Sequence, residues 1–452
     1  NLYGVDLDPK AVEIAQLNLL LKAAETKHRL PDLIENIKCG NSLIDDPAIA
    51  GERAFDWNKE FEAIMKEGGF DIIVGNPPYG REQINLIQKA GYKEADDMYT
   101  AFVLKSANLL KKGGYLGFII PVSWHTGERY LKFREIILQQ FNIYKIINLP
   151  FDVFKDAYVD TGIIIFRKNT PSKNFKLYSY PKNDETKQLL NVEQKLNTVD
   201  SKLIINDNLK RIFPQPKVYR IIEKISIKEI TQLGNITKSA IGILASEYEF
   251  SERKLTDDYL PFFVGNVYRY NFQRNEQTYV NFSKHTNTKY LDFYKGLRIL
   301  IRRIVNRQNR LMASITNEDC VTKKDLYSFK LSSSDYDIRY LLGLINSSLF
   351  SYLYISTSTI ATKDDFRQTT LAELRRLPIL KTPEKQQIKI AEKVDKMLLL
   401  KRQINKLENK QTDERAKLEK EIAELDRKID ELVYDLYGLS AEERKIVEEA
   451  VK

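Results

Sequence analysis

The sequence predicts an α/β protein that begins with a doubly wound sheet, and three observations carry this prediction. Short apolar segments alternate with helical ones up to about residue 170, which is typical of a sheet covered by helices on both faces. Residues 226–380 then mix short strands with Tyr, Arg, Asn and Ser, which predicts a second α/β domain. Beyond Pro383, leucine and isoleucine recur at steps of three and four, which predicts long helices.

The elements of the first part follow one another along the chain. A strand over residues 1–8 leads into a helix over 9–24, with Pro9 in its first turn, where its missing N–H is tolerated. "NIKCGNSLI" predicts a strand and a loop, and "FDIIVGNPPY" a strand that ends in a turn. The helix "MYTAFVLKSANLLKKGG" is expected to end at its two glycines. The strands "YLGFIIP", "YKIINLP" and "TGIIIFRK" complete the sheet, whose ligands should lie at the carboxyl ends of strands.

Composition divides the sequence into four segments. Residues 1–170 form the first α/β domain, and the polar, irregular residues 171–225 predict a connecting region. Residues 226–380 predict the second α/β domain, and 381–452 a helical tail. In the tail we expect two antiparallel helices with a coiled-coil seam, turning near "ENKQTDE". The seam positions are Met397, Leu400, Ile404 and Leu407, and then Leu418, Ile422, Leu425, Ile429, Leu432 and Leu436.

Composition also narrows the function classes. The net charge of +9 favours a polyanionic partner. The two cysteines, Cys39 and Cys320, are too few for a disulfide framework or a cysteine zinc site and suit a reducing cytoplasm. The three histidines have no metal-ligand spacing, so no metal is expected. No stretch approaches the roughly 20 apolar residues of a membrane span.

The strand-end turn "NPPY", residues 76–79, is the first candidate for chemistry. Pro77 and Pro78 lack N–H groups, so the backbone leaves the ladder and its carbonyls are free to accept hydrogen bonds. Asn76 adds a carboxamide oxygen and Tyr79 a flat ring. Two acceptors beside a ring suit the amino group of a planar base, because their hydrogen bonds would localise the nitrogen lone pair for attack on a methyl group. The same four residues could also merely end a strand.

With its neighbours, this turn resembles the S-adenosylmethionine-dependent N6-adenine DNA methyltransferases. "YGVDLDP" is similar to the family's motif whose acidic residue, here Asp6, holds the cofactor ribose. "CGNSL" places Asn41 where the family faces the cofactor adenine, and "FDVFKDAYVDTGIIIFRK" places Phe154 against the extruded base. The resemblance implies a Rossmann-like methyltransferase fold with S-adenosylmethionine as cofactor. It also implies that the NPPY turn is catalytic, that Tyr79 stacks on the base and that Asn76 lies at the cofactor.

The resemblance extends through the rest of the chain. "YLPFFVGNVYRYNF", "GLRILIRRIVNRQNRLMASI" and "LLGLINSSLFSYLYIS" look like a target-recognition domain, and the tail resembles that of fused type IIG restriction–modification proteins. The implied partner is double-stranded DNA in a prokaryotic cytoplasm. Basic residues crowd one segment, and we predict DNA contact there, although a solvated charged face is the ordinary alternative. The predicted DNA-binding residues are Arg298, Arg302, Arg303, Arg307, Arg310, Lys323 and Lys324.

The sequence departs from the family in one respect. It starts at the motif of Asp6, whereas the family has a glycine-rich loop just upstream, and Asn1 is not an initiator residue, so we expect a piece of a longer protein. A sheet without that first strand should expose ladder edges and apolar faces, and the chain by itself should bind cofactor poorly and not methylate. We find no Asp…Glu-x-Lys nuclease pattern. Two rival functions remain, an NPPY enzyme that acts on RNA or protein and a DNA-specificity module without catalysis.

Overall fold

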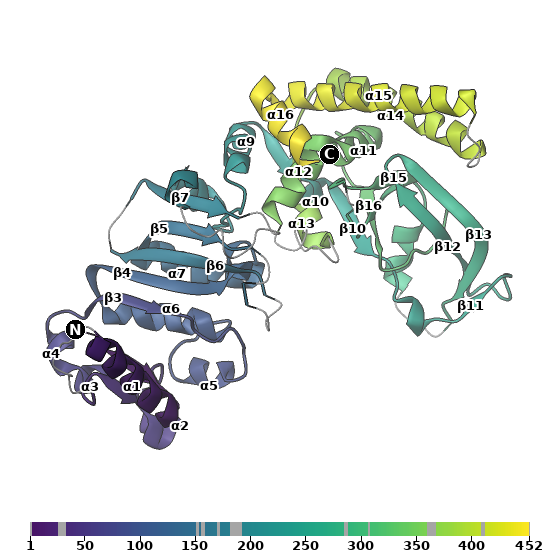
Figure 1. Cartoon of the computed structure of the whole chain (residues 1–452). Coiled ribbons are helices and arrows are strands. Elements are labelled where there is room, and N and C mark those ends of the chain that lie inside the picture. Colours follow the sequence, from purple (N-terminus) through teal and green to yellow (C-terminus); the bar gives the residue numbers. More distant parts are fainter. Residues whose placement is uncertain are drawn as a thin grey trace. The chain divides into compact units, whose positions relative to one another are not determined.

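The protein is described by a computed structural model in which the chain forms two compact units, Asn1–Pro216 and Lys217–Lys452 (Figure 1). The structure describes residues 2–25, 33–150, 153–154, 159–169, 172–180, 192–283, 288–305, 308–358, 368–407 and 412–451.

The first unit is built on a six-stranded sheet in the order β3-β4-β6-β5-β7-β8. The pairs β3–β4 and β5–β7 are parallel, and the other three pairs are antiparallel. Helices α6 (Met98–Leu109) and α7 (Leu131–Gln140) pack against β4 and β5. The strands are β3 (Phe70–Gly75), β4 (Leu110–Pro121), β5 (Phe141–Asn148), β6 (Thr161–Lys168), β7 (Asn174–Ser179) and β8 (Asn197–Asp200). The predicted α/β class is therefore confirmed.

Two boundaries differ from the sequence expectation. The helix that was expected to end at a pair of glycines ends earlier, at Leu109. The two glycines instead lie within β4. Gly113 has a φ of +82°, and the pairing of this part of β4 with β3 is irregular. The expected connecting region, 171–225, contributes β7 and β8 to the sheet. Its apolar residues Phe175 and Leu177 are buried because they alternate with polar ones that point outward, and this short alternation was hidden in a polar segment.

A separate parallel pair, β1 (Gly4–Asp6) and β2 (Ile37–Cys39), precedes this sheet. In the described part of the chain β1 is not paired with β3, which is therefore an edge strand. Ile72 and Val74 of β3 are 64% and 75% exposed. These values agree with the expected open edge and exposed apolar surface. The remaining elements of this unit are α1 (Pro9–Glu25), α2 (Pro47–Ala50), α3 (Trp57–Glu60), α4 (Glu62–Lys66), α5 (Ile84–Lys89) and α8 (Lys202–Asn206).

The second unit contains two antiparallel sheets, with strand orders β10-β16-β14-β15 and β11-β13-β12. A short pair, β9 (Ile230–Gln232) and β17 (Pro378–Leu380), lies outside them. The strands are β10 (Thr237–Ile241), β11 (Phe250–Ser251), β12 (Tyr259–Tyr268), β13 (Asn271–Asn281), β14 (Arg298–Arg302), β15 (Ala313–Thr316) and β16 (Leu326–Leu331). The apolar centre of β14, residues 299–301, is fully buried, so the four-stranded sheet forms part of the core.

Helices complete the second unit. The two long helices α14 and α15 pack against each other and confirm the predicted helical pair. Met397 and Leu400 of α14 and Leu425 and Ile429 of α15 are buried, as the seam predicts. The pair also packs on α11, so it is part of a larger core. The bounds are α9 (Pro216–Ser226), α10 (Leu233–Ile236), α11 (Ile338–Asn346), α12 (Ser348–Thr357), α13 (Leu371–Arg375), α14 (Glu384–Lys406), α15 (Asp413–Tyr437) and α16 (Ala441–Ala450).

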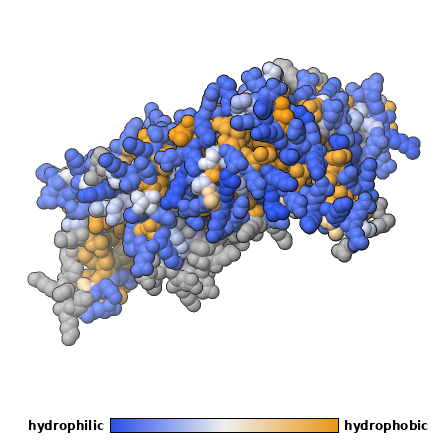
Figure 2. Space-filling model, turned by 90° about the horizontal axis from the view of Figure 1, so that it is seen from above, coloured by the Kyte–Doolittle hydropathy of each residue, from blue (hydrophilic) through white to orange (hydrophobic). Residues whose placement is uncertain are grey.

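Within the described residues, no helix combines the length and the apolar character that crossing a bilayer requires. The face of the molecule in Figure 2 is mostly hydrophilic, with apolar side chains in patches between polar ones.

The contact between α11 and α14 depends on a glycine, which yields a stability prediction. A Cβ atom at Gly343 would lie 2.6 Å from Ile390 Cγ2 and 3.1 Å from Val394 Cγ2. Gly343→Ala should therefore overpack the interface and lower the free energy of unfolding by about 1–3 kcal/mol, measured by urea denaturation. Glu392→Ala, on the exposed face of α14, is the control and should stay within about 0.5 kcal/mol of wild type. Equal stability of the two variants would contradict this packing.

Candidate functional site

The turn after β3 presents a carboxamide and an aromatic ring. Asn76 is exposed and the Tyr79 hydroxyl donates a hydrogen bond to its Oδ1 at 2.7 Å. The same hydroxyl lies 3.4 Å from the carbonyl oxygen of Ile119 on β4. Partial burial raises the pKa of Tyr79, so the phenol stays protonated and remains a donor. The hydrogen bond fixes which side of the Asn76 carboxamide is oxygen and leaves that oxygen a second lone pair.

The two rings predicted to hold a base lie together. The ring centroids of Tyr79 and Phe154 are 6.4 Å apart at an interplanar angle of 71°, an edge-to-face contact. The resemblance placed a base between them. In this geometry the rings contact each other, so a base would require them to move apart.

Asp6 and Asn41, the two predicted cofactor residues, are neighbours at the end of the β1–β2 pair. The register pairs Asp6 with Cys39, and Asn41 follows two residues later. Asp6 is exposed and its Oδ1 accepts a hydrogen bond from the Asp8 N–H at 2.8 Å, while Asn41 Oδ1 accepts from the Leu43 N–H at 3.1 Å. Both thus lie where ligands of such sheets are held. Within the described ranges, no hydrogen bond, ion pair or ring contact connects them to the NPPY turn.

Two predicted DNA-binding arginines are corrected by the structure. Arg298 is 0% exposed and donates hydrogen bonds to the carbonyl oxygens of Gly296, Glu318 and Cys320 at 2.8, 2.8 and 3.0 Å. It satisfies backbone groups where the chain passes between strands, and cannot face DNA.

Arg310 is likewise internal, at 8% exposure. It donates to Ser348 Oγ at 2.7 Å and to the Asn346 carbonyl at 2.8 Å, and lies 3.8 Å from Asp430. Burial lowers its pKa, and nearby Arg269 lowers it further, while Asp430 opposes this shift. Arg310 therefore joins α12 and α15 to the loop before β15, and its role is structural.

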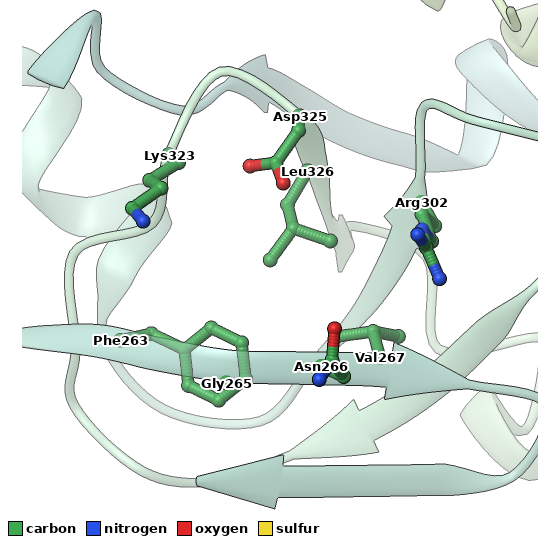
Figure 3. Close-up of a pocket in the computed structure, with 8 residues that line it drawn as sticks. All are labelled: Phe263, Gly265, Asn266, Val267, Arg302, Lys323, Asp325 and Leu326. Carbon is green, nitrogen blue, oxygen red and sulfur yellow. The ribbon is translucent and has the colours of Figure 1, made fainter. Parts of the chain in front are cut away.

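The remaining predicted basic residues behave differently. Lys323 and Lys324 are exposed, and Arg302 and Arg303 are partly exposed. Arg307 lies outside the described residues. Arg302 and Lys323 line one hollow of about 60 Å³ (Figure 3). The other residues that line it are Phe263, Gly265, Asn266, Val267, Asp325 and Leu326.

The hollow brings donors and an acceptor together. In Figure 3, Lys323 and Asp325 come from the turn before β16, Arg302 from the end of β14, and Asn266 from β12. The Arg302 guanidinium lies 5.9 Å from the Tyr268 ring centroid, within cation–π range. Among the described residues Asp325 makes no ion pair within 4.0 Å, so its carboxylate is available to a ligand. Sequence analysis did not single out Asn266 or Asp325.

A glycine bulge shapes this hollow. The pairing of β12 with β13 shifts between Val264 and Gly265. A Cβ at Gly265 would lie 1.9 Å from the carbonyl oxygen of Gln273, so only glycine fits. Because a bulge re-aims the residues that follow it, Gly265 sets the direction of Asn266. In the sequence, the glycine inside a predicted strand is the only trace of this bulge. A single glycine does not reveal how its strand pairs with the neighbouring strand, so the surface could not be predicted from it.

The remaining candidates for chemistry are the histidines and any groups of metal-ligating residues. His125 is buried, and this burial together with Arg134 lowers its pKa to about 3, so the imidazole is neutral. His28 and His285 lie outside the described residues. In the part of the chain that the structure describes, no group of His, Cys, Asp and Glu could hold a metal ion.

Comparison with known families supports the two-part organisation. Residues 1–154 match the family described as Eco57I restriction-modification methylase, and residues 260–379 match the TaqI-like C-terminal specificity domain. The first match contains the turn and both cofactor candidates, and the second contains the hollow. The chain therefore carries an Eco57I-like methylase domain and a TaqI-like specificity domain.

Individual relatives agree with these matches. The chain is 46% identical over 341 residues, 73% of its length, to the putative type II restriction enzyme and methyltransferase RM.MjaORFECS2P of Methanocaldococcus jannaschii. It is 30% identical over 302 residues, 57% of its length, to the type II restriction enzyme and methyltransferase RM.Eco57I of Escherichia coli. The aligned regions span 29% and 30% of these two proteins.

Solved structures confirm the fold. The type IIL restriction-modification enzyme MmeI, solved in complex with DNA, covers 99% of this chain with a TM-score of 0.62 and 15% identity, and the match spans 65% of that chain. The type ISP enzyme LlaGI, solved with a DNA substrate mimic, covers 88% of this chain with a TM-score of 0.51 and 13% identity, over 47% of its own length.

Because Arg298 is buried, we predict that its substitution lowers the stability of the protein, whereas substitution of an exposed basic residue does not. Arg298→Ala leaves three carbonyl groups without their donor, one of them in a fully buried hydrogen bond, and should lower the free energy of unfolding by about 1–3 kcal/mol. Lys324→Ala removes an exposed charge and should change it by less than about 0.5 kcal/mol. Chemical denaturation of both variants measures the difference. An Arg298 variant as stable as the Lys324 variant would restore a surface role to Arg298.

Proposed function

We propose that this chain, which carries an Eco57I-like methylase domain and a TaqI-like specificity domain, is the methylating and sequence-reading part of a restriction–modification enzyme. Its substrate is the N6 amino group of adenine in double-stranded DNA, and its cofactor is S-adenosylmethionine. The observation that carries this proposal is the NPPY turn, in which the Tyr79 hydroxyl donates a hydrogen bond to Asn76 Oδ1 and so orients the exposed carboxamide. Residues 1–170 act on the base, 226–380 read the sequence and 381–452 support the reading domain.

The turn suits the chemistry of a weakly nucleophilic amine. An extruded adenine would stack on Tyr79, and Phe154 would contact its edge. Asn76 Oδ1 and the Pro77 carbonyl would accept one hydrogen bond each from the two N–H bonds of the amine. This arrangement pulls the nitrogen toward tetrahedral geometry, so its lone pair points out of the ring plane and can form the N–C bond. Formation of the N–C bond would break the bond between the methyl group and the cofactor sulfur, which would keep the electron pair and leave as a neutral thioether. One of the two amine protons would then pass from the nitrogen to water, so no strong base is required.

The cofactor residues fit their proposed ligand. S-adenosylmethionine supplies an electrophilic methyl group when bound. Asp6 presents an exposed carboxylate at the end of β1, which suits the two hydroxyls of a ribose, and Asn41 presents a carboxamide at the end of β2, which suits an adenine ring. Their common place on the β1–β2 pair supports one shared ligand.

The hollow of the second unit suits the edge of a base pair. Arg302 and Lys323 donate hydrogen bonds, Asp325 accepts them, and Asn266 does both. Guanine presents two acceptors in the major groove and its cytosine partner presents an amino donor. A phosphate would be repelled by Asp325, so the mixed charges favour base reading over backbone contact.

Removal of the Asn76 carboxamide tests the catalytic turn. In the full-length enzyme, Asn76→Ala should lower the rate of labelled methyl transfer to DNA by about 100- to 1,000-fold and leave DNA affinity nearly unchanged, because the lost hydrogen bond acts on the transition state. Asn85→Ala, on the exposed face of α5, is the matched control and should transfer methyl groups normally. Near-normal turnover by the Asn76 variant would refute the assignment of the turn.

Substitutions in the hollow test DNA reading. Selection of bound sequences from a randomised duplex pool should show that Arg302→Ala or Asp325→Asn relaxes one position of the preferred site, with discrimination reduced about 5- to 150-fold. Lys238→Ala, exposed on β10, is the control and should keep every preference. If the hollow instead contacts phosphate, Arg302→Ala will weaken all sequences alike and lower the salt slope by about one unit.

A further inference from the structure

After the NPPY turn the chain makes an excursion of seventeen residues and then returns to the end of the turn. The Met98 N–H at the start of α6 donates a hydrogen bond to the Gly80 carbonyl at 3.0 Å. Residues 81–97, which include α5, therefore form an excursion whose two ends lie side by side. The end of the turn is thereby joined to the beginning of a buried helix.

A buried carboxylate lies at this junction. Asp97 is 3% exposed, and its Oδ1 is 3.4 Å from Arg81 Nε. Its Oδ2 accepts hydrogen bonds from Arg129 Nη2, at 2.9 Å, and from the Tyr130 hydroxyl. A carboxylate removed from water persists only with such partners, so this set of contacts is highly constrained. Arg81 is two residues after Tyr79 and thus links the turn to the carboxylate.

The same carboxylate is connected to the strand on the other side of the turn. The Tyr130 hydroxyl is 3.3 Å from Ser123 Oγ, which is 3.4 Å from the Tyr99 hydroxyl. Ser123 follows β4, the strand whose Ile119 carbonyl faces the Tyr79 hydroxyl. Asp97 thus holds both the segment that leaves the turn and the segment beside it.

We propose that Asp97 and Arg81 are positioning residues for the NPPY turn. The proposal rests on the proposed methyl transfer and deepens it. The buried Asp97 carboxylate holds Arg81, and Arg81 holds the exit of the turn, so that Tyr79 stays in hydrogen-bonding distance of Asn76. A displacement of about 1 Å at reacting groups can cost about 100-fold in rate, so this indirect contact controls the chemistry.

A direct DNA contact by Arg81 is the competing role, and the local charges oppose it. The two guanidiniums, Arg81 and Arg129, share their surroundings with three carboxylates, those of Asp97, the adjoining Asp96 and Glu82, which lies against Gly80. A phosphate would therefore meet no net positive charge. Arg81 is better matched to the carboxylate it already faces.

Arg81 offers a clean test because its side chain is 57% exposed, so its removal should not unfold the protein. We expect Arg81→Ala to lower the single-turnover rate of methyl transfer about 10- to 100-fold, with DNA affinity and melting temperature unchanged. Arg81→Lys, which keeps the charge, should recover part of the rate. Lys93→Ala is the matched control, because Lys93 is exposed on the same excursion and has no ion pair among the described residues.

Hydrogen exchange provides a readout that needs no activity. The backbone amide of Met98, which donates to the Gly80 carbonyl at the exit of the turn, should exchange faster in Arg81→Ala and in Asp97→Asn than in wild type or Lys93→Ala. An unchanged rate and unchanged exchange in Arg81→Ala would overturn the proposal, as would weaker DNA binding with a normal single-turnover rate. Absence of methyl transfer by the wild-type full-length enzyme would refute the proposed function instead, and faster exchange would still support the anchoring of the turn.

Discussion

The end of the β3 ladder at two prolines is the constraint on which the proposed active site depends. Pro77 and Pro78 have no N–H to donate, so pairing with β4 stops at Gly75, opposite Phe118. The next residue of β4, Ile119, keeps a carbonyl that faces the Tyr79 hydroxyl. The end of the ladder at Gly75 therefore allows the chain to bring the Tyr79 ring back against the neighbouring strand.

In the second unit a β-bulge, rather than the end of a ladder, directs side chains toward the candidate site. Gly265 shifts the register of β12, and the residues after it turn toward the hollow. The far end of this hairpin is clamped by Arg269, whose guanidinium forms a paired contact with Asp426 of α15 at 2.6 and 2.8 Å. Asn405 of α14 exchanges hydrogen bonds with Asn271. These polar contacts fix the register of the helices on the sheet, which explains why the helical tail belongs to the same compact unit.

Local sequence patterns predicted the elements whose formation depends on neighbouring residues in the chain. The alternation of strands and helices predicted the first sheet, heptad-like spacing predicted α14 and α15, and two consecutive prolines marked the turn. The errors concern residues whose role depends on distant partners. Arg298 and Arg310 resemble surface arginines in sequence, but each meets carbonyl groups that come from remote segments. Nothing in their own neighbourhood reveals those acceptors.

Residues that would touch a ligand can be recognised from local sequence, whereas the residues that hold them in place depend on distant partners. Asn76 and Tyr79 are recognisable because the turn that presents them is a contiguous tetrapeptide. Asp97 is a buried charge, yet in the sequence it is one acid in a polar excursion between α5 and α6. Its three partners converge only after Arg81 and the segment following β4 have been brought together by the parallel pairing of β3 with β4. The orientation of Asn76 and Tyr79 at the turn therefore depends on the buried contacts of Asp97. Without such support, an exposed carboxamide at the end of a strand would sample many orientations.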